Sequence, residues 1–488
     1  EARVDQAVTL TVEADEAHWS FGDGTELDGT TVEHTWTSGG RFRVQVRTEA
    51  GEAEATARVT WAPTQVSNAS TVAWHEGTLA AVVPDVGTLV LHDGDATSVH
   101  PICDRPVSVV RFEETWAVTC EEGAVAFLGG PVVTLPAGSR PRGAVVSNAR
   151  VWVALQGTGE LVAVRPDGVE AGFEAVPDPV GLAAVGTDLW TVPFRTTTTE
   201  ASVWGATELH PLPRDPGPDS DTDSRGQPNL LRLWATPDGN AVYAFGVKAN
   251  TERGVYLEDR PFTHDTTVRA FARPIGRASE LFFDDRDRIT AMAGTSDGLR
   301  VFALSAGDRT VDVFERDTGV RIGSVLDVGP DASGLVVVDT MLWVHSDREL
   351  RGYDVSDLAA PQVDPVVVPL LDGPDPVDPV LLQGRRLFQD AGDRRMSQVG
   401  YISCASCHPD GEQDGQVWDF TERGEGLRNT ISLRATLQGP LHWTANFDEL
   451  QDFEGDIRLF QGGTGFLADD DWHGTQDALR PAKIGLSA

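Results

Sequence analysis

Apolar and polar residues alternate in short runs over residues 1–62, for example at 8–12 and 42–46. Alternation with a period of two indicates β-strands with one buried face. A Gly-Asp-Gly turn at 22–24 separates these runs, as is typical of a connection between strands. The pattern therefore predicts a β-sandwich over residues 1–62.

Between residues 65 and 370, a pair of short apolar runs recurs, and each run ends in a turn. The second run of each pair opens on a large residue, and these residues are Leu79, Trp116, Trp152, Trp190, Tyr243, Ile289 and Trp343. A repeat of about forty to fifty residues provides the four strands of one β-propeller blade. We therefore predict a seven-bladed β-propeller over residues 65–370.

The pattern changes again after residue 370. A linker rich in proline and aspartate at 371–379 precedes an apolar-periodic run that ends at Phe388. Asp378 followed by Pro379 is typical of a helix start, because aspartate caps the first turn and proline fits the first helical position. Residues 371–488 are thus expected to form a small α-helical domain with long loops, in a multidomain protein that is mainly β.

The composition narrows the classes of partner. With 75 acidic and 39 basic residues among 488, the formal net charge is −36. Such a charge repels nucleic-acid phosphate and anionic lipid, so the expected partner is a cationic protein. No stretch approaches eighteen consecutive apolar residues, which predicts no transmembrane segment, and no signal segment is recognised at Glu1.

One motif carries recognisable chemistry, the C-x-x-C-H sequence at residues 404–408. Two thiols one helical turn apart can each add to a vinyl group of haem, and the adjacent imidazole can bind the iron. A redox dithiol does not need the histidine, and a zinc site would need a second pair of ligands. We therefore predict one covalent haem c, attached at Cys404 and Cys407 with His408 as the iron ligand.

The second axial position of the iron separates an electron carrier from a catalyst. His442 is our first candidate for this ligand. His473, Met396 and an open or water-bound iron are the alternatives, and the sequence leaves them open.

Cys103 and Cys120 lie within the length of one blade. Because haem c is assembled outside the reducing cytosol, these two residues are expected to form a disulfide, with two buried free thiols as the alternative. The expected location is the periplasm or the cell surface of a bacterium.

An acidic insertion is predicted at about residues 199–228. Alternating carboxylates can coordinate Ca²⁺, yet Ser224 stands where the calcium-loop motif has glycine. A calcium site and a solvated acidic loop both remain open, and the candidate ligands are Asp215, Asp219, Asp221 and Asp223.

Two resemblances support the β-rich domains. The runs His18-Trp19-Ser20-Phe21-Gly22-Asp23-Gly24, His34-Thr35-Trp36 and Gly40-Arg41-Phe42-Arg43-Val44 resemble the polycystic-kidney-disease (PKD) domain of extracellular proteins. This resemblance implies a spacer or an adhesive module. Stretches such as Arg140-Pro141-Arg142-Gly143 with Val151-Trp152-Val153-Ala154 resemble the YVTN-type bacterial propellers of the periplasm and cell surface.

A third resemblance surrounds the haem motif. Residues 384–388, 403–411, 428–433, 442–443 and 450–454 resemble the first haem domain of bacterial di-haem cytochrome c peroxidases and their methylamine-dehydrogenase-maturation relatives. The resemblance implies that Arg428, Asn429 and Trp443 lie beside the haem. That family uses two haems, whereas this chain has one attachment motif.

Three functions follow from these observations. The favoured one is an extracytoplasmic c-type cytochrome that exchanges electrons with a redox partner, with the propeller as an interaction scaffold. The second is a peroxidase- or oxidase-like oxidoreductase with an open iron site, so enzymatic activity is left undecided. The third is a mainly structural or adhesive surface protein, which assembles through its PKD and propeller modules.

Overall fold

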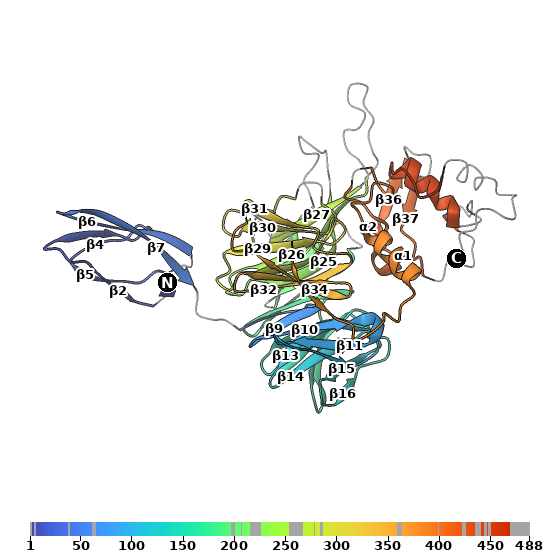
Figure 1. Cartoon of the computed structure of the whole chain (residues 1–488), viewed down its shortest axis with the longest axis horizontal. Helices are drawn as coiled ribbons and strands as arrows, with labels where there is room; N and C mark the ends of the chain where they lie inside the picture. The colour runs from blue at the N-terminus through green and yellow to red at the C-terminus, as the bar shows by residue number, and fades with distance from the viewer. Residues whose placement is uncertain are drawn as a thin grey trace, which may run out of the picture.

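The structure is a computed structural model of the chain, and it is mainly β (Figure 1). It describes residues 1–488 except 1, 4–5, 38–39, 61–64, 197–200, 206, 215–225, 253–266, 278, 284–285, 359–363, 399, 422–425, 435–440, 444–446, 448–449 and 469–488. No helix among the described residues is long and apolar enough to cross a membrane.

The first 60 residues form two sheets around one core. Their strands are β1 (Ala2–Arg3), β2 (Val8–Thr11), β3 (Ala17–Ser20), β4 (Glu26–Asp28), β5 (Thr31–His34), β6 (Gly40–Thr48) and β7 (Gly51–Thr60). One sheet has the order β1-β7-β6-β3-β4, and β2 pairs with β5 in the other. Trp19, Phe21 and Trp36 fill the space between them. The predicted turn begins at Gly22, whose φ of +76° and close approach to the backbone of Arg43 exclude a side chain.

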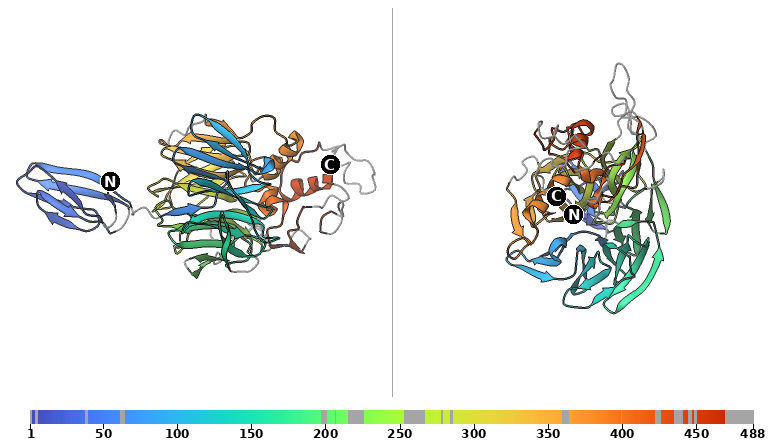
Figure 2. Two further views of the ribbon diagram at one scale, coloured as in Figure 1. Left: turned by 90° about the horizontal axis from the view of Figure 1, so that it is seen from below. Right: turned by 90° about the vertical axis from the view of Figure 1, so that its right-hand side faces the viewer.

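The described residues from 66 to 369 form seven sheets (Figure 2). Four of them take their strands from the first half of this region: β9 (Val72–His75), β10 (Thr78–Val83), β11 (Thr88–His92) and β12 (Thr97–Pro101); β13 (Pro106–Phe112), β14 (Thr115–Cys120), β15 (Ala124–Phe127) and β16 (Val132–Thr134); β17 (Pro141–Ser147), β18 (Arg150–Leu155), β19 (Glu160–Arg165) and β20 (Gly168–Glu174); β8 (Val66–Asn68), β21 (Pro179–Val185), β22 (Asp188–Pro193), β23 (Ala201–Gly205) and β24 (Glu208–Leu212).

The other three sheets continue the same up-and-down order. Their strands are β25 (Gln227–Ala235), β26 (Val242–Asn250) and β27 (Thr267–Pro274); β28 (Ile289–Gly294), β29 (Arg300–Ser305), β30 (Thr310–Glu315) and β31 (Arg321–Leu326); β32 (Ala332–Val338), β33 (Met341–Ser346), β34 (Glu349–Asp354) and β35 (Val366–Pro369). The first strand of each sheet contacts the first strand of the next, and β32 contacts β9. The body is thus propeller-like, with its first strands facing a common centre.

The centre is also where the chain enters this body. β8 pairs with β21 as an extra strand. The side chain of Asn68 exchanges hydrogen bonds with the backbone of Ala235 at 2.7 and 2.9 Å, and Ser67 Oγ accepts one from Val146 N at 2.9 Å. One short strand therefore ties three sheets together.

Two sequence predictions about the repeats were wrong in detail. Ile289 opens β28, the first strand of its sheet, whereas the other six marker residues lie on second strands. The prediction failed here because the apolar run of β28 resembles that of β29, the second strand of the same sheet. The predicted insertion at 199–228 includes β23 and β24, which are ordinary outer strands. The candidate calcium ligands Asp215, Asp219, Asp221 and Asp223 lie outside the described residues.

Cys103 and Cys120 form the predicted disulfide. Cys120 ends β14, and Cys103 follows β12, so the bond joins two neighbouring sheets.

The C-terminal segment is less helical than predicted. Its described elements are α1 (Pro379–Gln389), α2 (Cys404–Cys407), the 3-10 turns η2 (Pro409–Gly411) and η5 (Leu450–Phe453), the π-helical turn η6 (Asp456–Phe460), and a hairpin of β36 (Val417–Phe420) and β37 (Gly426–Asn429). Helix α1 begins as predicted, because Asp378 accepts a hydrogen bond from Val380 N and Pro379 follows it. The hairpin was missed because its apolar residues, Trp418 and Phe420, face the propeller-like body rather than a core of its own. Figures 1 and 2 show this segment and the N-terminal sheets at opposite ends of that body.

Candidate haem-attachment site

Helix α2 positions the C-x-x-C-H motif. The backbone N–H of Ser403 donates to Ser406 Oγ at 2.9 Å, which closes the first turn. The N–H of His408 donates to the carbonyl of Cys404 at 2.9 Å. Both cysteines are free thiols on this single turn. The two thiols and the imidazole therefore belong to five consecutive residues.

The imidazole of His408 has a defined tautomer. Its Nδ1 lies 3.1 Å from the carbonyl oxygen of Glu412, and because a carbonyl only accepts, Nδ1 carries the proton. Burial lowers the pKa of His408, which favours the neutral ring. The Glu412 and Ile431 backbones both hydrogen-bond the ring and oppose this shift. A neutral ring with this tautomer would offer Nε2 as the iron ligand.

The surroundings of the two thiols are apolar. Cys407 packs against an apolar cluster in which Trp418 and Phe420 meet strands of the propeller-like body, and Trp443 packs against the same cluster. Burial raises the pKa of Cys404 to about 11 and that of Cys407 well above its usual value. Burial therefore disfavours thiolates, whereas a thioether is neutral and suits this setting. In the part of the chain described, no group of three or more His, Cys, Asp or Glu residues is arranged to hold a metal ion directly. Two free thiols on one helical turn, followed directly by a histidine, are the residue types to which a haem c attaches.

The residues assigned by resemblance come together. The indole of Trp443 donates to the carbonyl of Asn429 at 2.7 Å, and the Arg428 guanidinium lies 5.9 Å from the Trp443 ring centroid. Trp443 and Cys407 both pack against the apolar cluster that contains Trp418 and Phe420.

The candidates for the second iron ligand have different surroundings. The ring of His442 stacks on Phe447 with centroids 4.5 Å apart and lies 4.7 Å from that of Trp443. Its Nε2 is 3.9 Å from a carboxylate oxygen of Asp456. Met396 is buried, and its sulfur lies 3.6 Å from Cys404 Sγ. His473 lies outside the described residues. The second axial ligand stays a prediction.

Hydrogen bonds that the sequence did not predict dock this site on the propeller-like body. Ser406 Oγ donates to Asp287 Oδ1 at 2.7 Å, and both residues are buried. Asn229 Nδ2 donates to the carbonyl of Asp414 at 3.0 Å, and Gln416 Nε2 donates to the carbonyl of Thr196 at 2.5 Å. The sequence offers only a weak signal for them, namely alternating acidic and basic residues directly before β28.

A second set of contacts docks helix α1. The buried carboxylate of Asp347 binds Arg385 and Arg386 at 2.6 Å each. Arg385 also binds Asp85 at 2.6 Å and Asp331 at 3.0 Å. These two arginines are part of the cytochrome resemblance, but in this structure they face the propeller-like body.

A buried pair of carboxyl groups makes the docking sensitive to pH. Asp308 Oδ2 accepts a hydrogen bond from the backbone N–H of Asp287 at 2.5 Å, and Ser305 also donates to it. Burial, and then the charge of Asp287, raises the pKa of Asp308 to about 6. The folded state therefore binds a proton more tightly than the unfolded chain.

We expect the Asp308→Asn variant to gain stability relative to the wild type as pH rises. Because the carboxyl pKa is raised in the folded state, the free energy of unfolding of the wild type falls between about pH 4 and pH 6 and is constant above that range. The fall is about 3 kcal/mol at most for a shift of two units. Asparagine keeps an acceptor but has no charge to bury. Thermal midpoints of both proteins at pH 4.5, 5.5 and 7 measure the effect, and a difference that does not change with pH would refute it.

A comparison with family models supports the fold of the N-terminal residues. A family model described as "PKD domain" matches residues 3–62. No curated protein sequence matches the chain. The chain is similar in structure to hydrazine synthase of Kuenenia stuttgartiensis, with 12% identity, a TM-score of 0.44 and coverage of 55% of this chain and 89% of that chain. It is also similar to apo AztD from Citrobacter koseri, with 12% identity, a TM-score of 0.36 and coverage of 73% and 95%.

A further similar structure is virginiamycin B lyase from Staphylococcus aureus, in a catalytically inactive H270A form with quinupristin. Its identity is 9%, its TM-score is 0.39, and the match covers 58% of this chain and 96% of that chain. The class defined so far is a mainly β protein with an N-terminal PKD domain and a propeller-like body.

Proposed function

We propose that the protein is an extracytoplasmic c-type cytochrome with one covalent haem, which exchanges electrons with a redox partner. The observation that carries the proposal is the arrangement of the C-x-x-C-H residues. Two free thiols share one helical turn, and the neighbouring imidazole holds its Nδ1 proton on the Glu412 carbonyl. A haem c bound here supplies a one-electron redox couple.

The residues around the motif have distinct tasks in this proposal. Cys404 and Cys407 provide the thioether bonds, and His408 binds through Nε2. Glu412 fixes the orientation of that imidazole through its carbonyl. Trp418, Phe420 and Trp443 exclude water from the side of Cys407. The net charge of −36 favours a cationic redox partner.

The proposed architecture is a PKD domain at 1–62, a closed seven-bladed propeller at 65–370 and a haem domain at 371–488. The contact between β32 and β9 supports closure. So does the 2.9 Å hydrogen bond between His345 Nδ1 and Thr71 Oγ1, which links the last sheet to the segment before the first. The PKD match and the disulfide support a place outside the reducing cytosol, at the periplasm or cell surface.

Absorption spectra of the purified protein, oxidised and reduced, test this function together with a pyridine haemochrome count. We expect one haem c per chain and low-spin bands that hydrogen peroxide leaves unchanged. A protein that is folded and matured with c-type maturation factors but carries no covalent haem would refute the proposal.

The cluster of Arg428, Asn429 and Trp443 favours a second candidate, a peroxidase-like oxidoreductase. The Arg428 guanidinium lies 5.9 Å from the Trp443 ring centroid, the Trp443 indole donates to the Asn429 carbonyl, and Trp443 packs against the same apolar cluster as Cys407. The same samples distinguish the two functions. High-spin iron that reacts with hydrogen peroxide would favour the enzyme over the electron carrier.

A further inference from the structure

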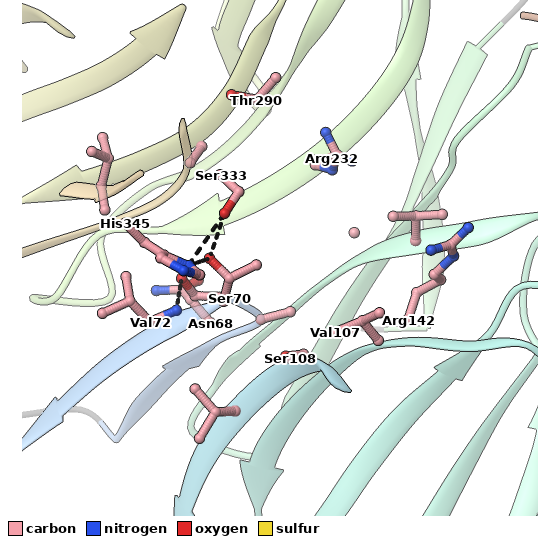
Figure 3. Close-up of a pocket in the computed structure, with 18 of the residues that line it drawn as sticks. Asn68, Ser70, Val72, Val107, Ser108, Arg142, Arg232, Thr290, Ser333 and His345 are labelled. Atoms are coloured by element: carbon pink, nitrogen blue, oxygen red, sulfur yellow. Dashed lines mark hydrogen bonds between the residues drawn. The ribbon is translucent and has the colours of Figure 1, made fainter. Parts of the chain in front are cut away.

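The first strands of the seven sheets surround a cavity of about 1270 Å³. The C-terminal segment covers part of it, because Ala405, Pro409, Asp410 and Gly411 contribute to the lining. Figure 3 shows His345, Ser333 and Ser70 on one side of the cavity, with Arg232 and Arg142 on another. Nothing in the electron-transfer proposal uses this space.

Arg232 differs from the other arginines that line the cavity. Arg142 bonds to Gln156 at 2.7 Å and lies 3.3 Å from Glu121 and 3.6 Å from Asp410. Arg288 likewise lies 3.3 Å from Asp287. By contrast, Arg232 forms no ion pair with any described residue, and its guanidinium lies 5.3 Å from the ring centroid of Phe194. One partly exposed positive charge on the cavity wall is therefore left without a direct partner.

The pKa of Arg232 is consistent with a guanidinium that has no direct ion-pair partner. Burial lowers its pKa to about 10; the charge of Asp410 opposes this shift, and the charges of Arg288 and Arg142 add to it. Asp410 is already shared with Arg142. Because the guanidinium lines the cavity and has no direct ion-pair partner, the site favours an anion that can reach it.

Neutral polar groups elsewhere in the cavity also lack partners. Burial lowers the pKa of His345 to about 4, so its ring is neutral at pH 7. Its Nδ1 lies near Thr71 and Ser333, but its buried Nε2 has no hydrogen-bond partner among the described residues. The same holds for the buried Thr290 Oγ1. Such atoms are rarely left unsatisfied, and a polar ligand can satisfy them.

We propose that the cavity binds a small organic carboxylate, whose carboxylate group bonds to the guanidinium of Arg232. A single uncompensated cation matches a monoanion better than a phosphate or sulfate dianion. Val180, Phe194 and Leu230 also line the cavity and suit a short carbon skeleton. The unpartnered atoms of His345 and Thr290 suit a second polar group. This binding site goes beyond the proposed electron transfer and does not depend on the haem.

Isothermal titration calorimetry on the full chain tests the proposal. The probes are acetate, lactate and benzoate, each paired with its neutral amide, together with inorganic phosphate and sulfate. We expect at least one carboxylate to bind about tenfold or more tightly than its amide, as a charge-assisted hydrogen bond implies. Binding of phosphate or sulfate in preference to every carboxylate, or no carboxylate binding, would overturn the proposal.

Variants locate the binding. Arg232→Met keeps a flexible apolar stem over Phe194 and removes the charge, so carboxylate affinity should fall by about tenfold or more. Arg150→Met is the matched control, because Arg150 pairs with Glu170 on an outer part of its sheet. Circular dichroism checks that both variants fold. Carboxylate affinity that is unchanged in a folded Arg232→Met variant would assign the binding elsewhere and refute this site.

Discussion

Replacing both Cys404 and Cys407 with serine is expected to abolish covalent haem binding. Serine has nearly the same shape as cysteine but cannot form a thioether, so the variant leaves α2 intact and removes only the attachment chemistry. The helix is held by Ser403, Ser406 and the His408 backbone, none of which the variant changes. Haem that remains with the protein after denaturation is the measurement, and it should fall from one per chain to none.

The chain offers a matched control for this experiment. Cys103→Ser with Cys120→Ser also removes two cysteines, but it breaks the disulfide between two sheets, which lies outside the haem motif. That variant should lose stability, by about 3 kcal/mol for a loop of this length, and keep its haem. Covalent haem in the variant without Cys404 and Cys407 would contradict the assignment. Loss of haem from a folded Cys103→Ser, Cys120→Ser variant, with haem kept in the other variant, would contradict it as well.

The sequence predicted those features that depend on local chemistry. Cys404, Cys407 and His408 lie together because they are neighbours in sequence, and the start of α1 follows from Asp378 and Pro379 alone. The repeat of apolar runs likewise indicated several sheets, because each run forms a strand whose side chains are buried between its own sheet and the next one. The disulfide was predictable because Cys103 and Cys120 are close in sequence.

Features that depend on contacts between distant residues were not predicted. Ser406 and Asp287 are 119 positions apart, and nothing in either local sequence indicates the other. The uncompensated charge of Arg232 became evident only when the pairs of Arg142 and Arg288 were known. The hairpin of β36 and β37 was mistaken for part of a helical domain because its apolar face is completed by residues of other sheets.

Asp347→Asn is expected to weaken the docking of helix α1 by about 2 kcal/mol, because it removes the buried carboxylate that binds Arg386 and Arg385, while Arg385 keeps Asp85 and Asp331 as partners. The Asp347 side chain is only 2% exposed and lies within 2.6 Å of both Arg385 and Arg386, and 3.5 Å from Arg348. Asparagine keeps the size of the side chain and tolerates the backbone φ of +41° at this position. Its amide group, however, presents donors to guanidinium groups that are themselves donors.

Amide hydrogen exchange in α1 measures this loss, because local opening of the docked helix exposes its N–H groups before the sheets unfold. Asp375→Asn is the control, since Asp375 binds Arg348 at 2.7 Å but is 25% exposed, and such a pair contributes about 1 kcal/mol or less. Equal protection of α1 in both variants would show that the buried carboxylate does not hold the segment. Faster exchange in Asp347→Asn alone would show that this carboxylate fixes α1, and with it the chain leading to the proposed haem site, against the propeller-like body.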